Sequence, residues 1–307
     1  MMTKPNLPQT IYKYVSHDSA LKILTNGTLR VGRPEGMNDP FDIYIDDLFN
    51  NTLEEIQRRS IPQLIELLES DPDRFASLTG ASANDVRRVF KIMASAPPPA
   101  RAAAMEEMCA TDLEKHDPEL AEMRKAMEPE LRSIQAQFRN TGIFCATRNN
   151  DNLLMWAHYA DQHRGAVIGF RPDVVRDSFF VALEPVRYSD VRPTFYQPID
   201  DMITKQEALS PEAISELRRM LVYSKSTHWA YEEELRVVIP NYIPDGQDAK
   251  FLRFYPTEFS ELYLGCRMTS IARASLIEVA TALNRNAAIF DVRPDKETYR
   301  LVSSPIK

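Results

Sequence analysis

Short apolar runs with the length of β-strands occur near both ends of the chain, and a long stretch of helical character separates them. IYKYV (11–15) and TLRVG (28–32) come before this stretch, and GIFCAT (142–147), GAVIGF (165–170) and ELRVVIP (234–240) come after it. Apolar and β-branched runs of about four to eight residues are typical of strands. The pattern predicts an α+β protein whose mixed or antiparallel β core is split in sequence.

The separating stretch, residues 52–140, is rich in Glu, Arg, Ala, Leu and Met. Its apolar residues recur at the three-to-four spacing of an amphipathic helix, and APPPA (96–100) interrupts it with a stiff break. We interpret it as a helical insertion between an N-terminal part of the core (1–51) and a C-terminal part (141–307). We expect the insertion to provide a surface for a protein partner or acceptor, although nothing in it names the partner.

Local signals place helices between the predicted strands. Ser16 is placed to cap HDSALKILT (17–25), and Asn26-Gly27 is a typical signal for the end of a helix. Further helices are predicted over LLMWAHYAD (153–161) and SIARASLIEVATALNR (270–285).

The overall charge limits the partners of the chain. Its 307 residues carry a formal net charge of −7. Non-specific binding to nucleic acid or to an anionic membrane needs a basic surface. We therefore expect no membrane association, and contact with nucleic acid only through a local patch.

Cysteine usage and the N-terminus indicate a soluble, cytoplasmic protein. Cys109, Cys145 and Cys266 are far apart, so neither a disulfide framework nor a Cys-x-x-Cys metal site is predicted. MMTKPNLPQT has no apolar signal core, and no long uncharged apolar run occurs. The nine glycines form no GxGxxG or GxxxxGK(S/T) motif, so no glycine-rich phosphate loop is expected.

Three consecutive glutamates, Glu232 to Glu234, stand at the start of a predicted strand. Side chains alternate between the faces of a strand, so we expect Glu232, Glu234 and Arg236 on one face and Glu233 on the other. One interpretation is a solvated strand end with an arginine–carboxylate pair. The other is a site for a polyhydroxylated or cationic ligand, because carboxylates accept hydrogen bonds from ribose hydroxyls and stabilise positive charge.

An aromatic group follows in LLMWAHYADQHRG. In a helix, Met155, Trp156 and Tyr159 share one side and His158 lies elsewhere. His158 and His163 are five positions apart rather than four, so a helical zinc pair is not predicted. The aromatic side chains are expected either in the core or stacked on a planar ligand ring.

Two further elements carry candidate residues. Lys13 alternates with Tyr12 and Tyr14 on the first predicted strand, where it either faces solvent or reaches a phosphate. Asn38 and Asp39 precede a proline, which is typical of a turn in which both side chains bond the local backbone.

Four segments together resemble the bacterial domain-of-unknown-function family 2971. They are YKYVSHDSALKILTNGTLRVGRPEGMNDPFD, CATRNNDNLLMWAHYADQHRGAVIGF, VRYS and KSTHWAYEEELRVV, and they occur in the order of the family pattern. The resemblance implies no activity. It singles out Lys13, Tyr14, Asn38, Asp39, Trp156, His158, Tyr159, Lys225, Trp229, Glu232, Glu234 and Arg236.

A more distant resemblance is to the fold of ADP-ribosyltransferases. IYKYVSHDSALKILTNGTLR is similar to their opening strand–helix–strand, with Lys13 at the position of a basic residue that contacts NAD. Glu232 to Glu234 resemble their late Glu-x-Glu, which contains the catalytic glutamate. The chain departs from the pattern in having Lys instead of His or Arg, and CATRN (145–149) is the nearest match to the Ser-Thr-Ser strand.

The resemblance implies an ADP-ribosyltransferase-like or NAD-cleaving enzyme, such as a toxin or a phage-defence component that modifies nucleic acid or protein. Glu234 would stabilise the ribose cation, Glu232 would bind or activate the acceptor, and Lys13 would hold phosphate or ribose. Tyr14, Trp156 or Tyr159 would stack on a ring. The expected nucleotide-binding set is Tyr14, Asn38, Asp39, Trp156, His158, Tyr159 and Arg236.

Two alternatives remain open at the level of sequence. One is a non-catalytic module that binds a nucleotide or a nucleic-acid end as a sensor. The other is a metal-dependent nuclease that uses Asp39, Glu232, Glu234 and His158, since carboxylates suit Mg²⁺ or Mn²⁺. No metal-ligand spacing motif supports the nuclease, and no metal ligands are predicted.

Overall fold

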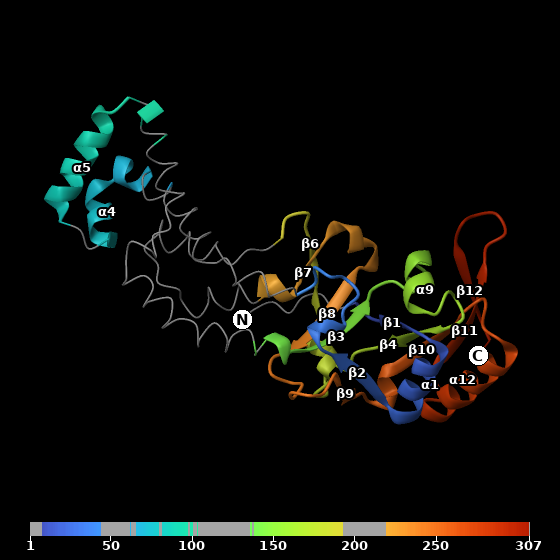
Figure 1. The fold of residues 1–307 in the computed structure, drawn as a ribbon. Coiled ribbons are helices and arrows are strands. Elements are labelled where there is room, and N and C mark those ends of the chain that lie inside the picture. Colours follow the sequence, from blue (N-terminus) through green and yellow to red (C-terminus); the bar gives the residue numbers. More distant parts are fainter. Residues whose placement is uncertain are drawn as a thin grey trace. The chain divides into compact units, whose positions relative to one another are not determined.

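The computed structural model divides the chain into two compact units. The first comprises Met1–Asp42, Gln137–Arg192 and Tyr223–Lys307, and the second comprises Ile43–Ala136 and Pro193–Val222. The structure describes residues 8–43, 66–79, 82–97, 138–192 and 219–306, with a few isolated positions between them (Figure 1).

The first unit is built on one large mixed sheet, to which both ends of the chain contribute strands. Among the described residues the order is β12-β11-β10-β4-β1-β3-β2-β9, with β8 beside β3 and β5 beside β8. β10 and β11 run parallel and the other pairs of this sheet run antiparallel. The mixed sheet with its helices confirms the predicted α+β class. The strands are β1 (Ile11–Val15), β2 (Thr28–Gly32), β3 (Gly142–Thr147), β4 (Ala166–Phe170), β5 (Glu184–Pro185), β8 (Glu234–Ile239), β9 (Ala249–Arg253), β10 (Phe259–Leu264), β11 (Ala288–Pro294) and β12 (Leu301–Pro305).

Short elements complete the first unit. A separate two-stranded parallel sheet joins β6 (Arg187–Tyr188) to β7 (Ser224–Lys225). The α-helices are α1 (His17–Asn26), α9 (Leu153–Tyr159) and α12 (Ser270–Leu283), and the 3-10 helices are η1 (Pro34–Gly36), η2 (Phe179–Ala182), η3 (Thr227–Glu232) and η4 (Pro256–Glu258).

The predicted boundaries of α1 are confirmed. The Ser16 side chain accepts a hydrogen bond from the Ser19 amide, which satisfies a donor that the first helical turn leaves free. Gly27 ends the helix in the left-handed conformation, with φ of 62°, and its amide donates to the Ile23 carbonyl. The chain therefore turns at once from α1 into β2.

Helices cover both faces of the sheet around β4. Ile168 and Phe170 belong to a buried cluster with residues of α1 and α12, which lie side by side in Figure 1. Val167 instead packs with Met155 and Trp156 of α9. Because successive strand residues face opposite ways, this alternation places α9 on the face opposite to α1 and α12.

The second unit contains α4 (Pro72–Thr79) and α5 (Ala83–Ser95). Leu68, Ala76 and Val86 form its small described core. Most of the predicted helical insertion lies outside the described residues. No helix in the described part of the chain combines the length and the apolar character that crossing a membrane requires.

Candidate functional site

The candidate site lies beside β3, where the neighbouring strands β1 and β2 separate from it. β8 pairs with β3 along its whole length, whereas β1 pairs with it at Tyr12–Thr147 and β2 at Gly32–Ile143. Between these two contacts the Cys145 carbonyl accepts a hydrogen bond from Nζ of Lys13 at 2.6 Å. A side chain therefore satisfies a backbone acceptor that the interrupted ladder leaves free.

A cavity of about 240 Å³ lies at this split, and every residue that lines it belongs to the first unit. Its wall combines basic, acidic, aromatic and apolar side chains. The polar and aromatic members are Tyr12, Lys13, Tyr14, Arg30, Arg33, Asn38, Cys145, Thr147, Tyr159, Lys225, Glu232 and Glu234. Such a mixture suits a ligand that carries both polar groups and a ring.

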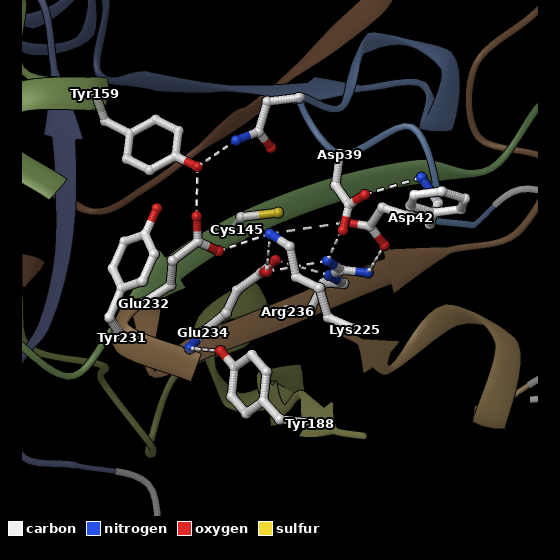
Figure 2. A network of polar contacts seen from close by, with 12 residues as sticks. Asp39, Asp42, Cys145, Tyr159, Tyr188, Lys225, Tyr231, Glu232, Glu234 and Arg236 are labelled. Atoms are coloured by element: carbon white, nitrogen blue, oxygen red, sulfur yellow. Dashed lines mark hydrogen bonds and ion pairs between the residues drawn. The ribbon is translucent and has the colours of Figure 1, made fainter. Parts of the chain in front are cut away.

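Five buried charged residues form a network at the cavity: Asp42, Lys225, Glu232, Glu234 and Arg236 (Figure 2). Lys225, Glu232 and Glu234 line the cavity, and Asp42 and Arg236 do not. Among the described residues, three carboxylates face two cations, so carboxylates outnumber cations in the network. Charges removed from water are tolerated only when partners compensate them. The network is therefore held together by its own ion pairs.

Arg236 is the centre of the network and is completely buried. Its Nε donates to Oε1 of Glu234 at 2.8 Å, and its Nη2 donates to Oε2 at 3.0 Å. Nη1 and Nη2 also donate to the two oxygens of Asp42, at 2.9 and 2.7 Å. The planar guanidinium fixes both carboxylates by forked hydrogen bonds.

Lys225 links the two pocket glutamates. Its Nζ lies 2.6 Å from Oε2 of Glu232 and 3.1 Å from Oε2 of Glu234. It also lies 4.9 Å from the centre of the Trp229 ring, within the range of a cation–π interaction. Burial works against the charged amine, but the two glutamates raise the pKa of Lys225, so it remains an ammonium.

Glu234 is ionised at any physiological pH. Burial alone would raise the pKa of Glu234, but the charge and hydrogen bonds of Arg236, together with Lys225, lower it to about 2. Glu234 therefore places a fixed negative charge on the wall of the cavity.

Glu232 has a different set of partners. The Tyr159 hydroxyl donates to its Oε1 in a short hydrogen bond, and Nδ2 of Asn38 donates to that hydroxyl at 2.5 Å. Burial, followed by the hydrogen bond to Glu232, raises the pKa of Tyr159, so its proton stays in place. A chain of polar contacts thus connects the loop after β2, the end of α9 and the end of η3.

The backbone that positions the glutamates corrects the expected strand alternation. Glu232 ends η3, and Glu233 is left-handed with φ of 44°, so β8 begins only at Glu234. Glu232, Glu234 and Arg236 do share one buried network, and Glu233 is exposed, as predicted. The reason is a helical turn followed by a left-handed residue, rather than period-two alternation of a strand.

Six of the predicted site residues line the cavity: Lys13, Tyr14, Asn38, Tyr159, Glu232 and Glu234. Lys13 does not face open solvent, because its amine reaches the Cys145 carbonyl and lies 5.3 Å from the centre of the Phe144 ring. The Tyr14 ring packs edge-on against Trp156, with ring centres 5.6 Å apart.

The remaining predicted residues lie elsewhere. Trp156 is completely buried and donates to the Asn150 carbonyl, so it packs in the core and cannot stack on a ligand. His158 is exposed beside Tyr231, and Asp39 bonds the Phe41 amide in the predicted turn. Arg236 acts behind the cavity through Glu234.

Sequence reasoning missed two members of the network. Asp42 lies in the NDPFD segment, and its partner Arg236 is 194 positions away, so no local spacing indicates the pair. Lys225 is part of the resemblance to family 2971 but received no role; its signal is a lysine four positions before the WAYEEE segment.

The chemistry available at the network differs from a metal centre. Among the described residues, no group of three or more His, Cys, Asp or Glu is placed to hold a metal ion. The pocket carboxylates instead bind Lys225 and Arg236. Burial raises the pKa of the Cys145 thiol, which therefore stays protonated at neutral pH.

Comparison with known proteins gives one match. Residues 155–237 match the family described as "Protein of unknown function (DUF2971)". The matched segment runs from α9 to β8 and contains Lys225, Glu232 and Glu234. No curated protein and no solved structure matches the chain.

Proposed function

We propose that the cavity binds NAD and that the protein cleaves the bond between its ribose and nicotinamide, as an ADP-ribosyltransferase-like or NAD-cleaving enzyme. The observation that supports this most is the buried network, which presents two fixed carboxylates and in which, among the described residues, carboxylates outnumber cations. Positive charge develops on the ribose as this bond breaks, and a preorganised negative site stabilises it. The opening strand–helix–strand, similar to that of ADP-ribosyltransferases, also favours this reaction.

In the proposed reaction, the bond between ribose C1′ and the nicotinamide nitrogen breaks, and nicotinamide leaves as a neutral base with the bonding electron pair. Glu234, with its low pKa, faces the developing positive charge. Water, or a nucleophilic group of an acceptor, forms the new bond to C1′. The proton that it loses passes to Glu232 and then to solvent.

Other cavity residues have supporting roles in this proposal. Tyr159 orients Glu232 through the hydroxyl hydrogen bond. Lys13 uses one N–H for the Cys145 carbonyl and has two others for a phosphate or ribose oxygen. The acceptor is proposed to be nucleic acid or protein, as for a toxin or phage-defence component, with the second unit as a surface for a partner.

The test is release of nicotinamide, followed by chromatography. The full chain is incubated with NAD⁺, with and without DNA, RNA or cell lysate. We expect release by the wild type and a loss of about a hundredfold or more in Glu234→Gln and Glu232→Gln. Glu297→Gln, an exposed change of the same charge, is the matched control and should not alter release.

Two outcomes would contradict the proposal. One is the absence of release in every mixture, and the other is unchanged release in both glutamate variants. Tryptophan fluorescence shows whether each variant is folded, because both tryptophans, Trp156 and Trp229, lie in the first unit. The second glutamate variant keeps the test valid if the first does not fold.

A second candidate is a nucleotide-binding module without turnover. It is favoured by the saturation of Glu234, whose two oxygens already accept hydrogen bonds from Arg236 and Lys225. A carboxylate held in this way can serve recognition rather than catalysis. Calorimetric binding of ADP-ribose without any release of nicotinamide from NAD⁺ would select this function over the enzyme.

A further inference from the structure

Arg30 and Gly32 lie two positions apart on β2, and both line the cavity. The guanidinium of Arg30 occupies the space where a side chain at position 32 would begin. A Cβ added to Gly32 would lie 2.9 Å from Nη1 of Arg30 and 3.5 Å from its Cζ. Glycine at position 32 therefore lets the arginine fold back along β2 towards the cavity.

Arg30 differs from the other arginine of the cavity. Arg33 donates through Nε to the Gln247 carbonyl at 2.6 Å, through Nη2 to the Pro244 carbonyl at 2.6 Å, and through Nη1 to the Arg139 carbonyl at 3.2 Å. These hydrogen bonds hold the Arg33 guanidinium against the backbone of two distant segments, so these donors are already used. Within the described parts of the chain, Arg30 has no carboxylate at ion-pair distance.

An unneutralised arginine on the wall of an acidic protein's cavity is suited to an anionic group. The chain as a whole is negatively charged, and the nearby network carries an excess of carboxylate. An anion is repelled by both unless a local cation receives it. A guanidinium offers paired N–H donors that match two phosphate oxygens, and Lys13 provides a second cation among the residues that line the cavity.

The size of the cavity limits the ligand. At about 240 Å³ it is smaller than typical pockets for drug-sized ligands, which are roughly 300–1,000 Å³. The cavity itself therefore holds one compact unit of a nucleotide, and the rest of a dinucleotide such as NAD would extend out of it. A ribose with its 5′-phosphate has hydroxyls for Glu232 and Glu234 and an anion for the basic wall.

We propose that Arg30, laid over Gly32, forms a phosphate subsite that makes the cavity specific for a phosphorylated ribose. This inference rests on the proposed function only in the choice of a nucleotide as ligand, because the anion subsite does not require turnover. The phosphate binds Arg30 and Lys13, and the ribose hydroxyls bind the glutamates.

The test compares two ligands that differ by one phosphate, nicotinamide mononucleotide and nicotinamide riboside, by calorimetry on the full chain. We expect the wild type to bind the mononucleotide, and Arg30→Gln to weaken this binding by about tenfold or more while leaving the riboside unaffected. Gly32→Ala should weaken it similarly although the arginine is retained, because the added Cβ displaces the guanidinium. Arg285→Gln, an exposed change of the same charge outside the cavity, is the control.

The subsite is overturned if the wild type does not bind the mononucleotide, or if Arg30→Gln binds it as the wild type does. It is also overturned if Arg30→Gln weakens both ligands equally. Arg30-dependent binding of the mononucleotide without nicotinamide release from NAD⁺ would support the subsite and contradict the enzyme. Undiminished NAD cleavage by Arg30→Gln would contradict the subsite and support the enzyme.

Discussion

Arg236 holds both oxygens of Glu234, with Nε 2.8 Å from Oε1 and Nη2 3.0 Å from Oε2. Arg236 is completely buried, and Glu234 lies at the wall of the cavity. The arginine therefore sets the position and the charge of a pocket group without reaching the pocket itself.

Replacing Arg236 by methionine should destabilise the first unit strongly. Glu234 and Asp42 would each lose a forked partner inside the protein, which typically costs about 3–5 kcal/mol. Urea unfolding followed by tryptophan fluorescence measures this, since Trp156 and Trp229 both report on the first unit. Arg293→Met is the matched control: its side chain is largely exposed in its pair with Asp291, so we expect a loss below about 1 kcal/mol. Equal losses in the two variants would contradict the central role of Arg236.

Glu234 should make the stability of the first unit depend on acid. Its pKa is lowered from 4.5 to about 2 on folding, which corresponds to about 3 kcal/mol. A carboxyl group whose pKa is lower in the folded protein than in the unfolded chain stabilises the fold fully at pH values above the unfolded pKa. This stabilisation is lost as the pH falls through the folded pKa. The stability difference between the wild type and Glu234→Gln should therefore shrink as pH falls from 4.5 towards 2.

The measurement is urea unfolding of both proteins at several pH values. Glu297→Gln, at an exposed position, should show a small difference that does not change with pH. A wild-type advantage over Glu234→Gln that stays constant across the acidic range would show that the pKa of Glu234 is not lowered.

Tyr159→Phe removes one hydroxyl that joins Glu232 to Asn38. The buried Glu232 carboxylate loses a donor, and hydrogen bonds to charged groups contribute about 1.5–3 kcal/mol. We expect a stability loss of this size by urea unfolding. Tyr231→Phe, a neighbouring tyrosine whose hydroxyl meets the exposed His158, should lose less than about 1 kcal/mol. The reverse order of the two losses would refute the role given to Tyr159.

Trp156→Phe tests whether the tryptophan is a core residue or a ligand-stacking residue. The side chain is completely buried, so a smaller ring leaves a cavity and lowers stability, by about 1–3 kcal/mol. Binding of nicotinamide mononucleotide should stay unchanged in calorimetry, because Trp156 does not line the cavity. Weakened binding in a folded variant would restore the stacking role. Trp229 remains to report unfolding.

Local signals predicted the elements whose ends are determined by neighbouring residues. The cap at Ser16 and the left-handed Gly27 set α1 and with it the strands on either side. The conformation of the three consecutive glutamates, in contrast, could not be predicted from local signals. Glu233 adopts a left-handed conformation that glutamate rarely favours, as the residue that caps the end of η3, with its amide donating to the Ala230 carbonyl. Strand alternation therefore predicted correctly that Glu232, Glu234 and Arg236 lie together, but the backbone achieves this in a different way.

Long-range contacts were beyond prediction for a different reason. Trp156 belongs to the segment that contains Tyr159, and sequence cannot tell which of two aromatic side chains enters the core and which reaches a cavity. The splitting of β3 from β1 and β2, which creates the cavity, is a property of the assembled sheet. Arg30 gave no signal at all, because its position depends on the missing side chain two residues later.

The pairing of Asp42 with Arg236 also has a consequence for synthesis of the protein. The two residues are 194 positions apart, and within the described residues the partners of β2 are β3 and β9. While the ribosome is still making the middle of the chain, β1 and β2 have emerged without the strands that they pair with, and Asp42 has no counter-charge. Contacts this distant in sequence require closing a long loop, which costs conformational entropy before the contact is made. The cavity can therefore be complete only when translation has passed the start of β8, so a chain that ends before β8 lacks Glu234 on the cavity wall.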